Sequence, residues 1–489
     1  MLEAIVFICG AVVMILEMVG SRILAPYLGT SIVVWTSLIG VILGSLSIGY
    51  WWGGRVADTK PSYRILSLVV LLAAVFVAAV AVSKSFLLGS LQQYSSSLPL
   101  GSTAAAMILF APPSILLGMI SPYAVRLKII DVKNSGSTVG SLYAISTVGS
   151  IFGTFFAGFF LIGFLGSTSI LIVLSIILAA TSLLASMQER KIKAASLCVF
   201  ILLLFASKAY DAHLAGLGVH DVDTDYNRVL VYHATDPAST RMTRVMVTNP
   251  HGKQSAMFVD NPSELAVQYT KFYQLAAHFK PGMKKILMLG GGGYSFPKFA
   301  LRHYPDVTME VVEIDPGITD LSRRFFALED DPRLTVRHED ARTFLNRATG
   351  KYDVILGDTF NSHYSIPFHM STVEAVRRLH ALLEEDGIVV ANILSAIEGD
   401  RGRFLRAEYA TFKAVFPQVF LIPVYSSSDG ESWQNVMLIA LKSSVEPVFQ
   451  SEDPVLNAML DRRWRKEIPA DVPVLTDDFA PVDRYVALQ

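Results

Sequence analysis

The sequence predicts a protein of two parts, a polytopic helical membrane domain followed by an α/β domain with a mainly parallel sheet. The chain of 489 residues is 52% hydrophobic and only 17% charged, and nearly all of the apolar excess lies before about residue 210. After that point short apolar runs alternate with amphipathic segments, which is typical of alternating strands and helices. The two parts should therefore fold on separate cores.

The first part contains a series of long apolar stretches. Most of them reach the roughly 18 to 20 residues that a helix needs to cross a bilayer. They are 4–24, 32–52, 65–82, 103–120, 138–164, 167–185 and a shorter one, 194–206. We expect residues 1–210 to form a transmembrane domain of six to seven spans.

The distribution of Lys and Arg predicts the orientation of these spans. Three loops are basic, whereas the loops between them hold only Arg22 and Lys84. By the positive-inside rule, the basic loops and the amino terminus are cytoplasmic. The basic residues of the three loops are Arg55, Lys60 and Arg64; Arg126, Lys128 and Lys133; and Arg190, Lys191 and Lys193.

Seven complete crossings would place the second part outside the cell, away from cytosolic nucleotides. The last stretch is the weakest, because its roughly 13 apolar residues span only about 20 Å against a hydrocarbon core of about 30 Å. We expect it to enter the membrane only in part, although snorkelling lysines would allow a full crossing. The protein is therefore predicted to be a multi-pass protein of the cell (inner) membrane, with its second part in the cytoplasm.

Polar and small residues within the spans suggest two further features. Glu17 lies in the first span, and an ionisable residue inside a membrane is a functional candidate by default, with a structural ion pair or an interfacial position as the alternative. Gly40 and Gly44, like Gly149 and Gly153, form small-xxx-small patterns that permit close helix packing. We expect this packing within one subunit rather than at a dimer face.

Charge and cysteine content exclude two classes of function. The formal net charge is -1, so no broad basic surface for a nucleic acid is expected. Cys9 and Cys198 both lie in apolar stretches, where they act as small hydrophobic residues rather than as disulfide or zinc ligands. No metal site is predicted, since a histidine pair at His363 and His369 has no evident third ligand.

The second part is predicted to begin, after a junction at 211–223, with a small β element and a helix within 211–280, before an α/β domain at 281–489. Strands of the small element are expected at 225–233 and 244–247, and its helix at 264–278. Strands of the α/β domain are expected at 286–289, 309–314, 334–338, 352–356, 387–393, 419–425 and 436–440. Its helices are expected after 293 and at 318–326, 341–347, 372–383 and 404–416. This alternation implies a mainly parallel sheet with an antiparallel edge.

The stretch 285–315 carries the most specific signal in the chain. An apolar run suited to a buried strand leads into four glycines at 290–293, which let the backbone approach a ligand without a Cβ in the way. A helix and a second strand follow, and Glu313 lies 20 residues after Gly293. An acid at this place can accept hydrogen bonds from both ribose hydroxyls. The layout predicts a nucleotide site, for a dinucleotide or an S-adenosyl compound.

Three acids each follow an apolar strand: Glu313, Asp340 and Asp358. Because the carboxyl ends of parallel strands meet at one edge of a sheet, we expect all three to line the ligand crevice. Each acid alone is equally well explained as a helix cap or a solvated surface group. Together they favour a binding site.

Several motifs resemble those of the spermidine synthases, the polyamine aminopropyltransferases, whose catalytic domain is Rossmann-like and of the S-adenosylmethionine methyltransferase kind. The motifs are GGGGYSFPK, VVEID, DPRLTVRHEDA, YDVILGD and VYSSSDGESWQNVMLIALK. The chain is similar in particular to the membrane-fused branch of that family, through LEMVGSRILAPYLG, IPFHMSTVE and LTDDFAPVDRY. The resemblance covers essentially the whole chain.

The resemblance implies a role for each matching residue. Glu313 would hold the ribose, and Asp340 and Ala341 would meet the adenine edge. Asn227 takes the place of a glutamine near the nucleoside, and Asp358 is the general base. The glycine turn of Gly290, Gly291, Gly292 and Gly293 would pack against the nucleoside and its methionine-derived chain. Other residues expected around the substrate or in a lid over it are Gln254, Tyr269, Tyr294, Asn361, Tyr364 and His369.

The implied reaction is attack on a carbon next to a sulfonium, with methylthioadenosine as the leaving group. The nucleoside is S-adenosylmethionine or its decarboxylated form, used as a substrate. A sulfonium leaves readily, so the protein must place the nucleophile in line and remove its proton, a role that suits Asp358. The loop after Asp358, with Tyr364 and His369, is the natural lid, although His369 is equally well explained as a cap of the next helix.

The chain departs from the family pattern at carboxylates that would hold a polyamine. Gly293 stands where spermidine synthases usually have an acid, and Asn361 replaces the second acid of their Asp-x-x-Asp loop. Their acidic Tyr-x-Glu element is Phe272, Tyr273 and Gln274 in this chain. A diamine buried without counter-charge would be expelled or deprotonated, which puts putrescine in doubt as the acceptor.

Three functions remain open from the sequence. The first is a membrane-anchored aminopropyltransferase of polyamine biosynthesis, which uses a nucleoside and an amine. The second is a lyase or cyclase that acts on S-adenosylmethionine without an amine, which the missing acids would allow. The third is a nucleoside-sensing or transport protein, against which the retained Asp358 argues. A homodimer is the expected assembly.

Overall fold

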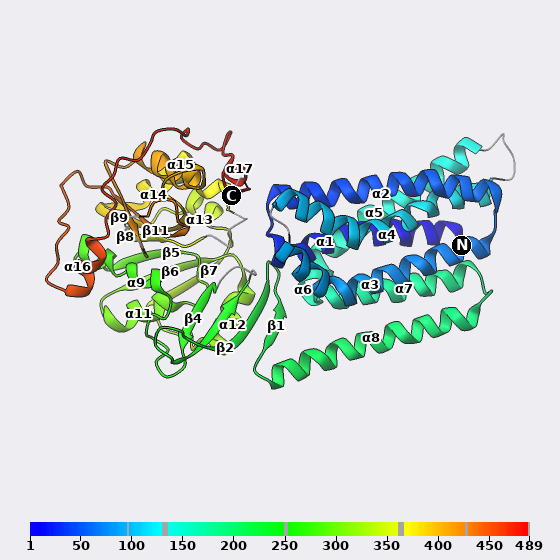
Figure 1. Cartoon of the computed structure of the whole chain (residues 1–489), viewed down its shortest axis with the longest axis horizontal. Helices are drawn as coiled ribbons and strands as arrows, with labels where there is room; N and C mark the ends of the chain where they lie inside the picture. Colours follow the sequence, from blue (N-terminus) through cyan, green and yellow to red (C-terminus); the bar gives the residue numbers. More distant parts are fainter. Residues whose placement is uncertain (95–96, 130–134, 249–252, 360–365, 426–428, 488–489) are drawn as a thin grey trace. The chain divides into compact units, whose positions relative to one another are not determined.

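The computed structural model describes residues 1–94, 97–129, 135–248, 253–359, 366–425 and 429–487. The chain divides into two compact units, Met1–Asp223 and Thr224–Gln489, coloured from blue to green and from green to red in Figure 1. The first unit thus ends at Asp223 rather than at the predicted residue 210. The small β element and the α/β domain, which we predicted as separate segments, belong to one unit.

The first unit consists of long apolar helices. Seven helices among the described residues are long and apolar enough to cross a membrane, which matches the upper count of the prediction. They are α1 (Leu2–Leu28), α2 (Ile32–Thr59), α3 (Tyr63–Tyr94), α4 (Leu98–Lys128), α5 (Ser135–Phe156), α7 (Ser167–Ala185) and α8 (Arg190–Gly216). A π-helical turn, η2 (Ala157–Leu161), and α6 (Ile162–Phe164) extend α5, and β1 (His220–Asp223) ends the unit.

The last helix is longer than the hydropathy pattern predicted. The apolar run 194–206 lies inside α8, which has 27 residues. At a rise of 1.5 Å per residue such a helix measures about 40 Å, enough to reach across a hydrocarbon core of about 30 Å. The helix is longer than the apolar run because charged residues on both sides of the run continue it, so its length permits a crossing. The expectation that it enters the membrane only in part stays a prediction.

Glycines allow close packing between helices of this unit. A Cβ on Gly149 or Gly153 of α5 would lie only 2.2 or 2.4 Å from carbonyl oxygens of α1, so the two backbones are in direct contact. This confirms the packing predicted for that pair within one chain. Around Gly40 and Gly44 of α2, no described atom lies within 4 Å of the added Cβ.

The second unit is built on a seven-stranded sheet of order β10-β11-β9-β8-β5-β6-β7. Strands β5 to β9 are parallel, and β11 and β10 add an antiparallel edge, as predicted. The strands are β5 (Lys285–Leu289), β6 (Thr308–Glu313), β7 (Leu334–His338), β8 (Tyr352–Gly357), β9 (Leu383–Ser395), β10 (Gln418–Pro423) and β11 (Gln434–Leu441).

Helices cover both faces of this sheet (Figure 1). In β5, Leu287 and Leu289 belong to one buried core, and Ile286 and Met288 belong to the other. The first core includes residues of α13 (Ala341–Arg347), α14 (Val373–Leu382), α15 (Arg403–Lys413) and α17 (Val482–Ala487). The second includes residues of α9 (Gln268–Phe272), α10 (Leu275–Phe279), α11 (Ser295–His303) and α16 (Pro454–Leu460). A strand buried on both faces has no polar side, which explains the continuous apolar run in the sequence.

A small antiparallel sheet precedes the large one. It contains β2 (Arg228–Thr235), β3 (Met242–Val247) and β4 (Ser255–Phe258). The sequence did not predict β4, because its four residues are all buried and show no alternation. The single helix predicted at 264–278 is also wrong: the chain forms α9 and α10, separated by a turn at Tyr273 and Gln274.

Candidate active site

The site lies where the strand order of the large sheet reverses. From β5 the chain runs outward to β6 and β7, then returns to the other side of β5 with β8 and β9. Such a switch point leaves a ligand crevice at the carboxyl ends of the strands. Gly290 N donates to Val312 O, and Asp358 N donates to Leu289 O, so the glycine turn is tied to both neighbouring strands.

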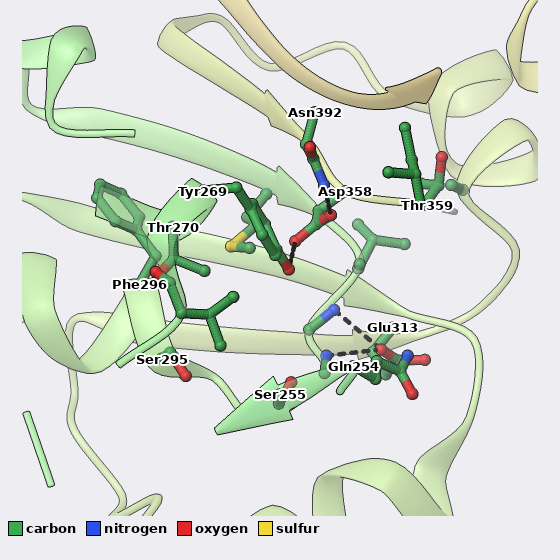
Figure 2. Close-up of a pocket in the computed structure, with 18 of the residues that line it drawn as sticks. Gln254, Ser255, Tyr269, Thr270, Ser295, Phe296, Glu313, Asp358, Thr359 and Asn392 are labelled. Atoms are coloured by element: carbon green, nitrogen blue, oxygen red, sulfur yellow. Dashed lines mark hydrogen bonds between the residues drawn. The ribbon is translucent and has the colours of Figure 1, made fainter. Parts of the chain in front are cut away.

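A cavity of about 710 Å³ lies at this switch point, a volume typical of small-molecule sites. Figure 2 shows Asp358 and Glu313 among the side chains that line it. The predicted site residues that line the cavity are Gln254, Tyr269, Gly290, Gly291, Gly292, Glu313, Asp340, Ala341, Asp358 and His369. Most of the predicted site is therefore brought together around one cavity.

Glu313 fastens the glycine turn to the end of β6. Its carboxylate is 8% exposed, and its Oε2 accepts hydrogen bonds from Gly291 N at 2.9 Å and Gly292 N at 3.2 Å. Its Oε1 accepts from Asp315 N at 3.0 Å. Burial raises the pKa of Glu313, whereas these N–H groups act to lower it. Oε2 already accepts two hydrogen bonds, whereas Oε1 accepts one and has a second lone pair with which Glu313 can accept from a ligand.

Gln254 lies next to Glu313 in Figure 2. Its Oε1 is buried and has no hydrogen-bond partner within the described part of the chain. Leaving a buried acceptor unpaired costs about 1–3 kcal/mol, so a ligand hydroxyl or ammonium that donates to it would relieve this cost. Gln254 and Glu313 both line the cavity, and each has an oxygen that can accept a further hydrogen bond.

Asp340 caps a helix and also lines the cavity. Its Oδ1 accepts from Thr343 N at 2.9 Å and so caps α13, while its Oδ2 lies 3.4 Å from His369 Nε2. Both residues line the cavity. The alternative for His369, a cap of the next helix, is wrong, because α14 is capped by the side chain of Thr372.

Asp358 is held by neutral donors at the end of β8. Its Oδ2 accepts from the Tyr269 hydroxyl at 2.9 Å, and its Oδ1 accepts from Asn392 Nδ2 at 3.0 Å. Asn435 Nδ2 donates to Asn392 Oδ1 at 2.9 Å, which orients the Asn392 amide toward Asp358. Burial raises the pKa of the Asp358 carboxyl, and the hydrogen bonds from Asn392, Tyr269 and Tyr273 act to lower it. A partly buried carboxylate of this kind can take a proton from a ligand.

The absence of a side chain at Gly290 allows the glycine turn to lie directly against the backbone of Asp358. Its φ is +94°, a left-handed conformation that favours glycine, and a Cβ there would lie 2.1 Å from the carbonyl oxygen of Asp358. The backbones of Gly290 and Asp358 are therefore in direct contact. No other residue type fits this position without moving one of them.

Ser255 and the two asparagines are functional candidates that sequence reasoning missed. Ser255 Oγ accepts from Gly293 N at 2.8 Å, and a Cβ on Gly293 would lie 2.8 Å from Ser255 Cβ. The strand β4 thus fills the space that a side chain at 293 would need, and Gly293 does not line the cavity, contrary to its predicted ligand contact. The signal for Asn392 was a polar residue within the apolar run 388–394 of β9, whereas Asn435 lies beside Gln434 at the start of β11 and carries no such signal.

Tyr294 supports the glycine turn from the protein interior. Its side chain is fully buried, and its hydroxyl lies 2.7 Å from Thr319 Oγ1. A Cβ on Gly291 would lie 2.7 Å from the Tyr294 ring, so the turn closes over the ring only because a glycine is there. This corrects the prediction that Tyr294 meets the substrate or belongs to a lid.

Asn227 fixes the start of a helix rather than lining the cavity. Its Nδ2 donates to Asp315 Oδ2 at 3.1 Å, and Thr224 Oγ1 donates to the same oxygen at 2.5 Å. Asp315 Oδ1 accepts from Gly317 N at 3.0 Å and so caps α12 (Pro316–Phe325). The predicted direct contact of Asn227 with the nucleoside is therefore corrected to support through Asp315.

Three predicted residues fall outside the described part of the chain. Asn361, His363 and Tyr364 lie in the range 360–365, and their roles stay predictions. Among the described residues, no group of three or more His, Cys, Asp and Glu could hold a metal ion. What the described residues form is a cavity at the switch point of a Rossmann-like sheet, with the carboxylates of Glu313, Asp340 and Asp358 in its lining.

Comparison with known proteins identifies the domain. Residues 269–437 match the spermine/spermidine synthase domain. The polyamine aminopropyltransferase of Vibrio vulnificus is 29% identical over 221 residues, which cover 42% of this chain and 71% of the relative. A probable polyamine aminopropyl transferase of Bifidobacterium longum is 27% identical over 309 residues, 58% of this chain and 67% of the relative. A solved structure of a probable spermidine synthase from Corynebacterium glutamicum is 24% identical, with a TM-score of 0.41, over 50% of this chain and 85% of its own.

The second unit therefore carries a spermine/spermidine synthase domain, which confirms the resemblance stated from the motifs. The matched range begins in α9, ends in β11 and includes Glu313, Asp340 and Asp358. It does not include the helical unit. The relation to a membrane-fused branch of the family stays a prediction.

Proposed function

We propose that the second unit is an aminopropyltransferase-like enzyme that acts in polyamine biosynthesis. It would bind decarboxylated S-adenosylmethionine, or S-adenosylmethionine, move the carbon chain from sulfur to an amine and release methylthioadenosine. The observation that carries the proposal is that one cavity joins the acceptor pair Gln254 and Glu313 to the carboxylate of Asp358. The domain match and the names of the relatives support the same activity.

In this proposal the nucleoside occupies the side of the cavity beyond β6. Gln254 and Glu313 accept hydrogen bonds from the two ribose hydroxyls, which would satisfy the unpaired Gln254 Oε1. Asp340 and Ala341 meet the adenine edge. The chain that leads to the sulfonium passes over the glycine turn, where the absence of side chains allows close approach.

Asp358 is the proposed general base. An ammonium cannot attack until it loses a proton, and Asp358 is the carboxylate nearest to the end of β8 in the cavity. Its raised pKa, which burial causes, moves it toward neutral pH and makes it a better proton acceptor than an ordinary aspartate. Tyr269 and Asn392 hold its two oxygens in place, so the proton transfer needs little reorganisation.

A second candidate function is a lyase or cyclase. The side chains next to Asp358 in the cavity include the neutral amides of Asn392 and Asn435 rather than further carboxylates. A reaction without an amine acceptor is compatible with this neutral surface. S-adenosylmethionine itself would then break down intramolecularly to methylthioadenosine and a lactone or similar product. A nucleoside sensor or transporter would bind the same ligand and release neither product.

Product analysis by mass spectrometry separates these functions. The full chain is supplied with each nucleoside, with and without an amine. Methylthioadenosine and an aminopropylated amine that form only when the amine is present support the transferase. Methylthioadenosine released from S-adenosylmethionine without any amine contradicts it and supports the lyase.

We further propose that the helical unit anchors the enzyme in the cell membrane, as a multi-pass homodimer with its second unit in the cytoplasm. The seven apolar helices and the three basic loops support a membrane location. A cytoplasmic second unit requires α8 to lie in the interface despite its length, whereas seven crossings require the opposite side. Labelling of single cysteines on the two sides of the membrane decides between them. Glu17, partly buried in α1, stays a candidate for a role of the helical unit.

A further inference from the structure

The part of the cavity around Asp358, here the acceptor end, is built from five other side chains. They are Tyr269, Asn392, Leu394, Tyr425 and Asn435, all of which line the cavity. Tyr269 and Asn392 donate hydrogen bonds to Asp358, and Asn435 donates one to Asn392. Asn435 is paired with Leu394 across β11 and β9, and its carbonyl accepts from Val424 N, next to Tyr425. These contacts make the five side chains one continuous wall.

Asp358 is the only charged side chain of the acceptor end among the described residues. The other charged residues that line the cavity are Glu313, Asp340 and Lys253. Glu313 ends β6, two strand positions from β8, and Asp340 follows β7, a further position away. Since neighbouring strands lie about 4.8 Å apart, the strand ends that carry these two carboxylates stand roughly 10 Å or more from the end of β8. The sequence stretches 360–365 and 426–428, FNSHYS and SSS, contain no Asp or Glu.

One carboxylate can balance one cation. In the proposed transfer, the lone pair of the acceptor nitrogen forms the new N–C bond, the C–S bond breaks, and its electron pair stays on sulfur as a neutral thioether. The proton of the acceptor ammonium passes to Asp358, which becomes neutral. A second ammonium on the acceptor would then have no counter-charge at this end, and burying an unpaired charge costs several kcal/mol.

The wall offers groups for an uncharged polar tail instead. The amides of Asn392 and Asn435 and the hydroxyl of Tyr425 can donate to or accept from a hydroxyl, amide or carbonyl. Leu394 provides apolar contact for methylene groups. These groups can satisfy the hydrogen bonds of a neutral polar tail, and no unpaired charge is buried.

We propose that the acceptor end takes an amine with a single cationic centre and an uncharged hydrogen-bonding tail, such as an amino alcohol, in preference to a diamine. This inference rests on the proposed function, because it names the acceptor class of the same transfer. It assigns Asn392 and Asn435 to acceptor recognition, in addition to their contact with Asp358.

The test compares two acceptors of equal length, 4-aminobutan-1-ol and putrescine, on the full chain in detergent with decarboxylated S-adenosylmethionine fixed. We expect kcat/KM for the amino alcohol to exceed that for putrescine by ~10-fold or more, since one uncompensated charge is worth at least 1.4 kcal/mol. An equal or higher value for putrescine overturns the inference and leaves the proposed function intact. Methylthioadenosine release that neither amine changes overturns both.

A matched pair of variants tests the same point by gain of function. Asn435→Asp adds a carboxylate to the acceptor end, whereas Asn435→Ser removes the amide without adding charge. We expect Asn435→Asp to shift the ratio of the two kcat/KM values toward putrescine by ~10-fold relative to Asn435→Ser. Equal ratios in the two variants contradict the inference. Because each ratio is measured on one preparation, a general loss of folded protein does not affect it.

Discussion

The two ends of the cavity differ in how their carboxylates are held. The end of the cavity around Glu313 is called the nucleoside end. There the Glu313 carboxylate accepts hydrogen bonds from three backbone N–H groups, and Gln254 Oε1 has no described partner. At the acceptor end, the described partners of the Asp358 carboxylate are side chains, among them the Tyr269 hydroxyl and the Asn392 amide. One carboxylate is fixed by the main chain of the fold, and the other by side chains that can be exchanged.

In the proposed function, this difference assigns nucleoside binding to one end of the cavity and the choice of amine to the other. Backbone donors at a strand end and a glycine turn are set by the sheet, so the nucleoside end should vary little in function when single side chains are changed elsewhere. Side-chain partners allow the acceptor end to change its charge, and with it the amine, while the base stays in place. Under the proposed function, such a site would keep one nucleoside chemistry and still take another acceptor.

The largest expected effect comes from Asp358→Asn at the acceptor end. The substitution removes the proton acceptor but keeps the shape and the hydrogen bond from Tyr269. We expect turnover to fall by about 10²–10⁴-fold, as is typical for loss of a general base, with the Kd of methylthioadenosine changed by less than about 3-fold. Steady-state kinetics and calorimetric binding measure the two quantities. An equal loss of binding would mean that Asp358 positions the ligand instead of acting as the base.

Gly290→Ala tests the contact between the two ends. The added Cβ would lie 2.1 Å from the carbonyl of Asp358, at a φ of +94°. We expect a loss of stability of about 3 kcal/mol or more, together with loss of activity, because either the turn or the base must move. Gly282→Ala is the matched control, since its φ is also positive, at +71°, but no atom lies within 4 Å of the added Cβ. The control should cost only about 1 kcal/mol. Similar shifts in Tm for both variants would show that the close contact is unimportant.

Glu313→Gln should weaken nucleoside binding without changing the residues around Asp358. Two of the N–H groups of the glycine turn would face an amide in place of a carboxylate oxygen, and the ribose would lose a charged acceptor. We expect the Kd of methylthioadenosine to rise by about 10- to 100-fold. Glu310→Gln is the control, because Glu310 lies on the same strand but bonds Arg337 and Tyr352 away from the cavity. If both variants bind methylthioadenosine like the wild type, the nucleoside does not lie at Glu313.

Asn392→Ala should produce the smallest change, a shift in pH dependence. The Asn392 amide favours the ionised form of Asp358, so its removal raises a pKa that burial has already raised. The base is active when ionised, and the acidic limb of the kcat profile should therefore move to higher pH. Profiles of the wild type and the variant show the shift directly. An unchanged acidic limb would mean that a different group is titrating.

Much of the second unit could be predicted from the sequence because its signals are local. The strand at 334–338 and the helix at 341–347 have the predicted bounds, and the acids Glu313, Asp340 and Asp358 line one cavity as expected. Each of these follows from an apolar run and the residue directly after it. The helical unit was predictable for the same reason, apart from the charged ends that lengthen α8.

What the sequence did not reveal depends on contacts between distant residues. Asn227 was expected at the nucleoside but bonds Asp315, and Tyr294 was expected at the ligand but fills the space beneath Gly291. The amide chain from Asn435 through Asn392 to Asp358 joins three strands. No local pattern specifies such a chain, because its members are neighbours only after the sheet has formed.

A cryo-electron microscopy structure of the full chain with methylthioadenosine tests the central claim most directly. The account predicts that the ribose hydroxyls meet Glu313 and Gln254, and that the sulfur lies over the glycine turn on the side of Asp358. It also predicts that the wall of Asn392 and Asn435 is left free for a second substrate. Methylthioadenosine bound away from the switch point, or with its ribose against Asp358, would contradict the account.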